Sequence, residues 1–127
     1  MTTTILAITL IASVICFQRR DIMSKLIFNP AKVHNSNEWW RFITSGFIHA
    51  DWTHLIVNMI AFYFCGIAVE HYYKEVFEGS ARTYYLILYF GGMVMSIYPT
   101  YLKHKENPYY NALGASGAVS SVLFAFI

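Results

Sequence analysis

Long apolar runs separated by short polar connections constrain the fold of this chain more than any other feature. The runs occupy residues 2–17, 47–69, 83–102 and 112–127. About twenty apolar residues suffice for a helix to cross a bilayer, and a spanning segment must be helical because lipid cannot pair the backbone of an open strand. The pattern predicts an all-α, polytopic membrane helix bundle with three complete transmembrane helices and the start of a fourth.

Composition agrees with a membrane protein. Of the 127 residues, 57% are hydrophobic and 13% are charged, whereas about 25% of a typical soluble domain is charged. The length predicts one domain. The net charge is only +2 and basic residues do not cluster with aromatic ones, so no nucleic-acid partner is expected. Cys16 and Cys65 lie inside apolar runs and are expected to be buried hydrophobic side chains.

The connection over residues 18–46 is polar and is predicted to be irregular. It contains Trp39, Trp40 and Arg41 in succession, a combination that suits the headgroup level of a bilayer. We therefore expect this loop to dip into the membrane interface. The basic residues of the connection place it in the cytoplasm if charge alone is counted.

The second apolar run carries four polar residues near its start, namely His49, Asp51, His54 and Asn58. His54 and Asn58 are one helical turn apart and share a face. Their N–H groups could stabilise an oxyanion, or they could form an interhelical hydrogen-bonded pair. His49 points elsewhere and is expected to be structural. A metal site from His49, Asp51 and His54 is disfavoured because the three do not converge on one helical face.

The fourth run opens with Ser116 between Gly114 and Gly117. If Ser116 begins a helix, unpaired backbone N–H groups would face negative charge that develops beside its hydroxyl. Ser116 is therefore a candidate nucleophile. Gly114, Gly117, Ala118 and Ser121 are also spaced as a small-residue stripe for helix packing, so the segment alone leaves both functions open.

Taken together, four short motifs resemble the rhomboid family of intramembrane serine proteases. They are Trp40-Arg41, His49-x4-His54-x3-Asn58, Gly66-x3-Glu70 and Gly114-Ala115-Ser116-Gly117. Each motif is weakly specific by itself, but the four occur in the family's order and spacing. The resemblance implies that residues 1–127 are the N-terminal part of a single rhomboid-like membrane domain.

The resemblance also implies roles for these residues. Ser116 would be the nucleophile, and His54, Asn58 and the Ser116 N–H would stabilise the oxyanion. The residues implied to be structural are His49, Trp40, Arg41, Gly66, Glu70, Gly114 and Gly117. No metal or cofactor is implied. The partners would be transmembrane protein substrates and membrane lipid. The protein would be a multi-pass integral protein of the cell (inner) membrane. The family places the first loop outside the cytoplasm, and we follow it over the charge count.

One departure from the family concerns the general base. The family uses a histidine on a later helix, and no histidine follows Ser116 before the last residue, Ile127. A serine without its base is a weak nucleophile. We expect a C-terminally truncated protease that is inactive alone. The alternatives are a short, degenerate homologue and a catalytically inactive pseudoprotease that binds membrane clients.

Overall fold

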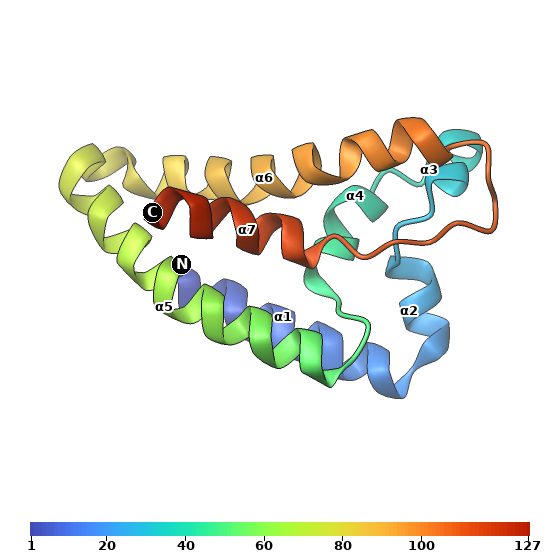
Figure 1. The fold of residues 1–127 in the computed structure, drawn as a ribbon, viewed down its shortest axis with the longest axis horizontal. Helices are drawn as coiled ribbons and strands as arrows, with labels where there is room; N and C mark the ends of the chain where they lie inside the picture. The colour runs from blue at the N-terminus through green and yellow to red at the C-terminus, as the bar shows by residue number, and fades with distance from the viewer.

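The computed structural model describes all residues from Met1 to Ile127 and consists of helices joined by turns and loops (Figure 1). This confirms the predicted all-helical fold. The four long helices are α1 (Thr2–Gln18), α5 (Trp52–Phe77), α6 (Ala81–His104) and α7 (Ala115–Phe126). The short elements are α2 (Arg20–Leu26), α3 (Pro30–Ser36), α4 (Arg41–Thr44) and the 3₁₀ turns η1 (Ser45–Phe47) and η2 (Glu78–Ser80).

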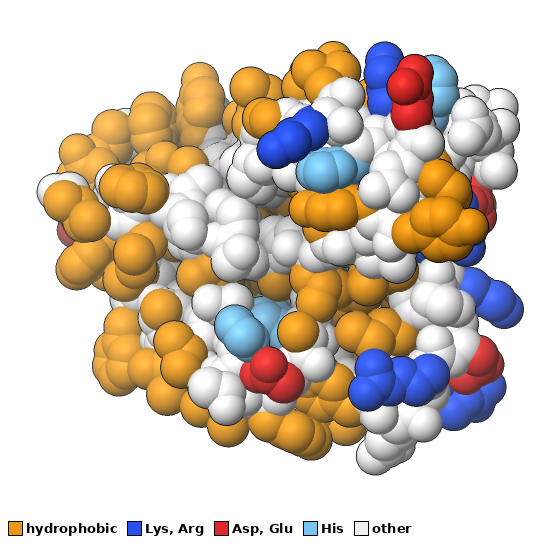
Figure 2. All heavy atoms as spheres, turned by 45° about the vertical axis from the view of Figure 1, so that its right-hand side comes forward, with side chains coloured by type: hydrophobic (Ala, Val, Ile, Leu, Met, Phe, Trp, Pro, Cys, Tyr) orange, Lys and Arg blue, Asp and Glu red, His pale blue; other side chains and the backbone are white.

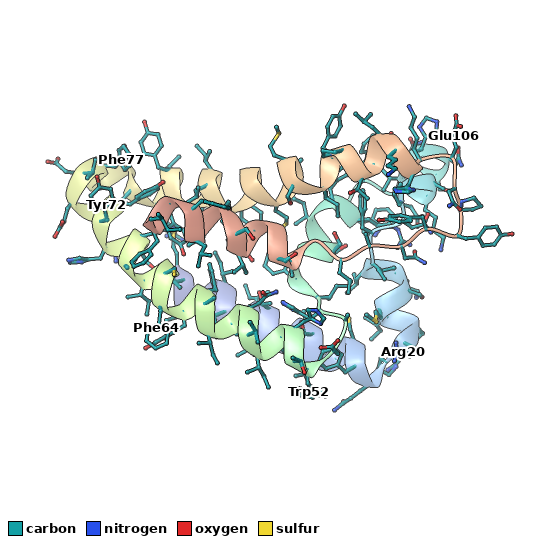
Figure 3. The ribbon with its side chains drawn as sticks, in the orientation of Figure 1. Arg20, Trp52, Phe64, Tyr72, Phe77 and Glu106 are labelled. Carbon is teal, nitrogen blue, oxygen red and sulfur yellow. The ribbon has the colours of Figure 1, made fainter.

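One helical segment is long and apolar enough to cross a membrane by length and composition. It covers residues 52–104 and consists of α5, η2 and α6 in succession. Helices α1 and α7 are apolar but shorter. Trp52 and Phe64 point away from the bundle (Figure 3), and both are more than half exposed. Hydrophobic side chains cover much of the left half of the surface, and charged ones gather at the right (Figure 2). Such a broad exposed apolar surface is typical of contact with lipid.

Helix α7 packs against both α5 and α6 and forms the centre of the bundle (Figure 1). The largest core cluster joins α1, α5, α6 and α7 through Ile5, Phe62, Val69, Tyr85, Tyr89, Met93, Ala118, Val119 and Val122. Gly92 of α6 lies against Ser121 of α7, and a methyl group added at Gly92 would collide with that serine. Small residues therefore let α6 and α7 approach closely, as they do between membrane helices generally.

The prediction of an irregular connection over residues 18–46 is wrong, because short helices fill it. Arg41 is buried and donates from Nη1 to the carbonyls of Ser24 and Ile27 at 2.9 and 2.7 Å. Trp40 donates from its ring N–H to the carbonyl of Lys25 at 3.2 Å. These bonds pair carbonyls that the last turn of α2 leaves without helical partners.

Helix boundaries also differ from the predicted ones. The second long helix begins at Trp52 rather than at residue 47, because Asp51 caps it, and it continues past residue 69. The third extends over Ala81–His104, beyond residues 83–102 at both ends, and continues through Pro99. The fourth begins at Ala115 rather than at residue 112. Ala112 instead pairs with Phe28 through two backbone hydrogen bonds of 2.9 and 3.0 Å.

Candidate active site

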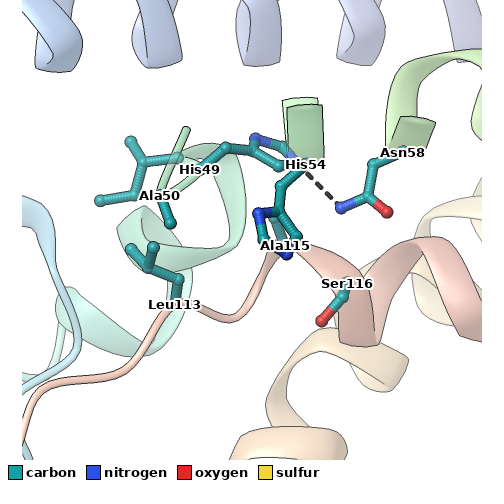
Figure 4. A pocket seen from close by; sticks show the side chains of 8 residues that line it. His49, Ala50, His54, Asn58, Leu113, Ala115 and Ser116 are labelled. Atoms are coloured by element: carbon teal, nitrogen blue, oxygen red, sulfur yellow. Dashed lines mark hydrogen bonds between the residues drawn. The ribbon is translucent and has the colours of Figure 1, made fainter. Parts of the chain in front are cut away.

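A pocket of about 220 Å³ lies where the start of α5 meets the start of α7 (Figure 4). Its lining residues are Ile48, His49, Ala50, His54, Asn58, Leu113, Ala115 and Ser116. The structure thus brings together the three predicted catalytic residues, Ser116, His54 and Asn58, although 58 positions separate the serine from the asparagine.

Ser116 is the second residue of α7, and its side chain is exposed. Its backbone N–H belongs to the first turn and forms no hydrogen bond with a backbone carbonyl. Gly114, two residues before Ser116, donates a 3.1 Å hydrogen bond from its N–H to the carbonyl of Ser45. The nucleophile candidate and an unpaired donor therefore lie at one helix start, which carries partial positive charge.

The glycines beside Ser116 pack against neighbouring elements. A methyl group at Gly117 would collide with Ser96 of α6, and one at Gly114 would lie 3.2 Å from Ile97 Cδ1. The two functions left open for this segment are therefore compatible. Gly117 faces the α6–α7 contact while Ser116, one residue earlier, faces the pocket.

His49 and Asn58 are joined by a 3.0 Å hydrogen bond between Asn58 Nδ2 and His49 Nε2 (Figure 4). The amide nitrogen is a donor only, so Nε2 must accept and the ring proton must sit on Nδ1. Nδ1 then donates to Ser13 Oγ of α1, with 3.0 Å between the two atoms. The Ser13 hydroxyl donates in turn to the carbonyl of Phe47 at 3.2 Å. Burial and, to a smaller extent, the His54 charge together lower the pKa of His49 to about 4, against an opposing effect of Asp51, which agrees with a neutral ring.

His54 is held by Asp51, the N-cap of α5. Asp51 accepts from the His54 backbone N–H at 2.9 Å and pairs with His54 Nδ1 at 2.8 Å. These bonds, led by the backbone one, lower the pKa of Asp51. Because Nδ1 donates to a carboxylate, the neutral ring has an acceptor at Nε2, and only a protonated ring offers a donor there.

Ser13 and Asp51 were not among the predicted site residues. Asp51 has a signal in the sequence, since an aspartate three residues before His54 at the start of an apolar run is a typical N-cap. Ser13 has none, because its partner His49 is 36 positions away on another element.

Glu70 and Gly66 lie outside the pocket, towards the other end of α5. Glu70 accepts from the Met1 ammonium at 3.0 Å and from the Thr2 N–H at 2.9 Å, so it caps the start of α1. A methyl group at Gly66 would lie 2.6 Å from Thr2 Cγ2. Both residues therefore sit where α1 packs against α5.

The chain resembles known proteins over most of its length. The Rhomboid domain family matches residues 36–127. The rhomboid protein YdcA of Bacillus subtilis (strain 168) is 30% identical over 72% of this chain and 42% of its own. RHOMBOID-like protein 4 of Arabidopsis thaliana is 33% identical over 72% of this chain and 21% of its own. Rhomboid protease AarA of Providencia stuartii is 26% identical over 82% of this chain and 40% of its own.

The chain spans less than half the length of these curated relatives. No solved structure matches it significantly. The family match nevertheless covers well over half of the chain and includes the pocket residues His49, His54, Asn58 and Ser116. This chain belongs to the rhomboid family of integral membrane proteins.

Proposed function

We propose that this chain carries the nucleophile and the oxyanion donors of a rhomboid-type intramembrane serine endopeptidase. Its substrates would be transmembrane proteins, and its location the cell (inner) membrane. In this proposal α1, α5 and α6 each span the bilayer and α7 is the start of a fourth span. The relatives named as proteases support the proposal.

One observation carries it. Ser116, with its exposed hydroxyl and unpaired N–H, lines the same pocket as Asn58, which has an N–H donor, and His54, which has one there when its ring is protonated. Helix packing alone would leave no reason for these groups to share one hollow, since polar side chains in a membrane bundle are costly unless they are used.

The mechanism follows from these positions. Ser116 Oγ attacks the scissile carbonyl while its proton passes to a general base, and the base returns the proton to the departing amine. The tetrahedral oxyanion accepts from the Ser116 N–H and from the Asn58 amide hydrogen that does not bond His49. His54 contributes a third donor when its ring is protonated. Water then hydrolyses the acyl-enzyme.

The base is proposed to lie on a segment of the whole protein outside these 127 residues. His49 cannot serve, because Nε2 and Nδ1 are both engaged, with Asn58 and Ser13. His54 keeps an acceptor at Nε2, but its one side-chain hydrogen bond is to Asp51 and not to Ser116, and it is assigned to the oxyanion. A serine needs a base within hydrogen-bond reach to become a nucleophile.

The test compares two serines of α7 in the whole protein, reconstituted with a fluorescent transmembrane substrate. Ser116→Ala should lower the cleavage rate by about 10³-fold or more. Ser120→Ala is the matched control, because Ser120 is also exposed on α7 but does not line the pocket, and it should cleave normally. Cleavage that survives Ser116→Ala would refute the assignment of the nucleophile.

A fluorophosphonate probe separates the protease from a client-binding pseudoprotease. The whole protein should be labelled, and Ser116→Ala should remove the label. Residues 1–127 expressed alone should remain unlabelled, because the proposed base is missing. Unlabelled whole protein that still retains transmembrane clients would support the pseudoprotease instead. Strong labelling of residues 1–127 would show that a base within the chain activates Ser116.

A further inference from the structure

A second and larger hollow lies between α1 and α6, and it extends from Lys74 and Arg82 near the α5–α6 turn to Phe47 of η1. It measures about 520 Å³ and is lined by Met1, Thr4, Ile5, Ile8, Phe47, Glu70, Lys74, Arg82, Leu86 and Phe90. α1 packs along α5, whereas it meets α6 at few points, among them the 2.7 Å hydrogen bond between Thr2 Oγ1 and Tyr85 Oη. The two helices therefore form the walls of an open groove, with α5 supplying the residues at one end.

The groove is apolar along its length and charged at one end. Arg82, Leu86 and Phe90 recur at every fourth position and share one face of α6 over about 12 Å. Ile5 and Ile8 lie on the facing wall of α1. An extended hydrocarbon chain fits such a groove, because beyond the charged residues the lining is apolar except for Thr4.

The charged end has an excess of cations. Glu70 is already paired, with the Met1 ammonium at 3.0 Å and with Lys74 Nζ at 3.2 Å. Arg82 is exposed and forms no ion pair with any carboxylate of the chain. Its guanidinium has a planar fork of donors that matches phosphate oxygens. The lining charges sum to about +2, from three cations and one carboxylate.

The charged end also lies at the depth where lipid headgroups are expected. Tyr72 and Tyr84 are exposed near the α5–α6 turn, and tyrosine is enriched at membrane interfaces. Tyr72 and Phe77 mark this end of the bundle, beside the turn (Figure 3). Arg82 is two residues from Tyr84 and therefore sits near the same level.

We propose that this groove binds one anionic phospholipid. The phosphate lies on Arg82 and Lys74, and one acyl chain runs between Ile5 and Ile8 on α1 and Leu86 and Phe90 on α6. A basic pocket between membrane helices is a recognised arrangement for anionic headgroups. The inference goes beyond the proposed protease activity, which uses other residues, and does not depend on it.

The test is native mass spectrometry of the whole protein, released from detergent with phosphatidylglycerol or phosphatidylcholine. Phosphatidylglycerol should be retained in preference. Arg82→Gln and Lys74→Gln should each weaken its binding about fivefold. Lys103→Gln is the matched control, because it removes an exposed cation from the far end of α6, and it should leave binding unchanged.

A third variant tests the acyl groove without altering charge. Ile8→Trp should fill the groove and displace the lipid, while an unchanged helical circular dichroism spectrum in detergent shows that the protein is folded. Equal retention of both lipids, or binding unchanged in Arg82→Gln and Ile8→Trp, would overturn the proposal. So would full displacement by inorganic phosphate, which would indicate an anion site without an acyl chain. Cross-linking of Ile8→Cys to another segment of the whole protein would show that protein covers the groove.

Discussion

The side-chain amide of Asn58 donates a hydrogen bond to Nε2 of the buried His49, and this one bond determines how both residues can act. It fixes the His49 proton on Nδ1, where it points at Ser13. It also holds the Asn58 amide in place while leaving one of its two hydrogens free. His49 thus positions a catalytic candidate and ties α1 to α5.

The neutral state of His49 predicts how stability depends on pH. Its pKa is about 4 in the folded protein and 6.5 without the fold. Between these values the unfolded state binds more protons than the folded state. The contribution of His49 to the free energy of unfolding is therefore fully present above about pH 6.5 and is lost as the pH drops towards 4. The loss should appear in thermal unfolding of the protein in detergent. His49→Asn should be less stable at neutral pH and should lack this part of the pH dependence; an unchanged slope would contradict the assignment.

Asp51 allows its two roles to be separated. Asp51→Ala removes both the N-cap of α5 and the carboxylate that bonds His54, whereas Asp51→Asn keeps a good cap. Asp51→Ala should lower the unfolding midpoint by several degrees and Asp51→Asn by much less. Both variants should change the His54 tautomer, which long-range ¹⁵N NMR of the imidazole reports. A ring signal identical to wild type in Asp51→Ala would exclude the pairing.

Neighbouring glycines of α6 should respond oppositely to the same substitution. A methyl group at Gly92 would collide with Ser121, whereas one at Gly91 meets nothing within 4 Å. Gly92→Ala should destabilise the protein by about 1–3 kcal/mol because the α6–α7 contact is overpacked. Gly91→Ala should be neutral or stabilise by up to about 1 kcal/mol, since alanine favours the helix. Unfolding in detergent distinguishes them, and equal effects would refute the close approach.

Arg41 should not tolerate lysine. Its Nη1 bonds two carbonyls at the end of α2 from a buried position. Lysine offers a point charge without the planar fork, so Arg41→Lys should destabilise the protein by about 1–3 kcal/mol. Arg20→Lys, at an exposed position on α2, is the control and should be neutral. If Arg41→Lys were as stable as Arg20→Lys, the contacts of Arg41 with the two carbonyls would contribute little to stability.

Local patterns predicted the helical class but not every helix boundary. The second helix starts later than its apolar run because Asp51 caps it, and the fourth because Ala112 pairs with Phe28. The short helices between α1 and α5 escaped prediction because they are held by side chains such as Arg41, whose acceptors lie 14 and 17 positions away. Propensity over so few residues is too weak to indicate a helix by itself.

By itself, the sequence determined the all-helical class, the order of the motifs and the family. Apolar length and helical spacing are local properties, and they showed that His54 and Asn58 share a face. Only the tertiary structure decided which groups meet: Asn58 with His49, His54 with Asp51, and Ser116 with the pocket between α5 and α7. The physical reason is that periodicity specifies the direction of a side chain, whereas its partner depends on how helices distant in sequence pack.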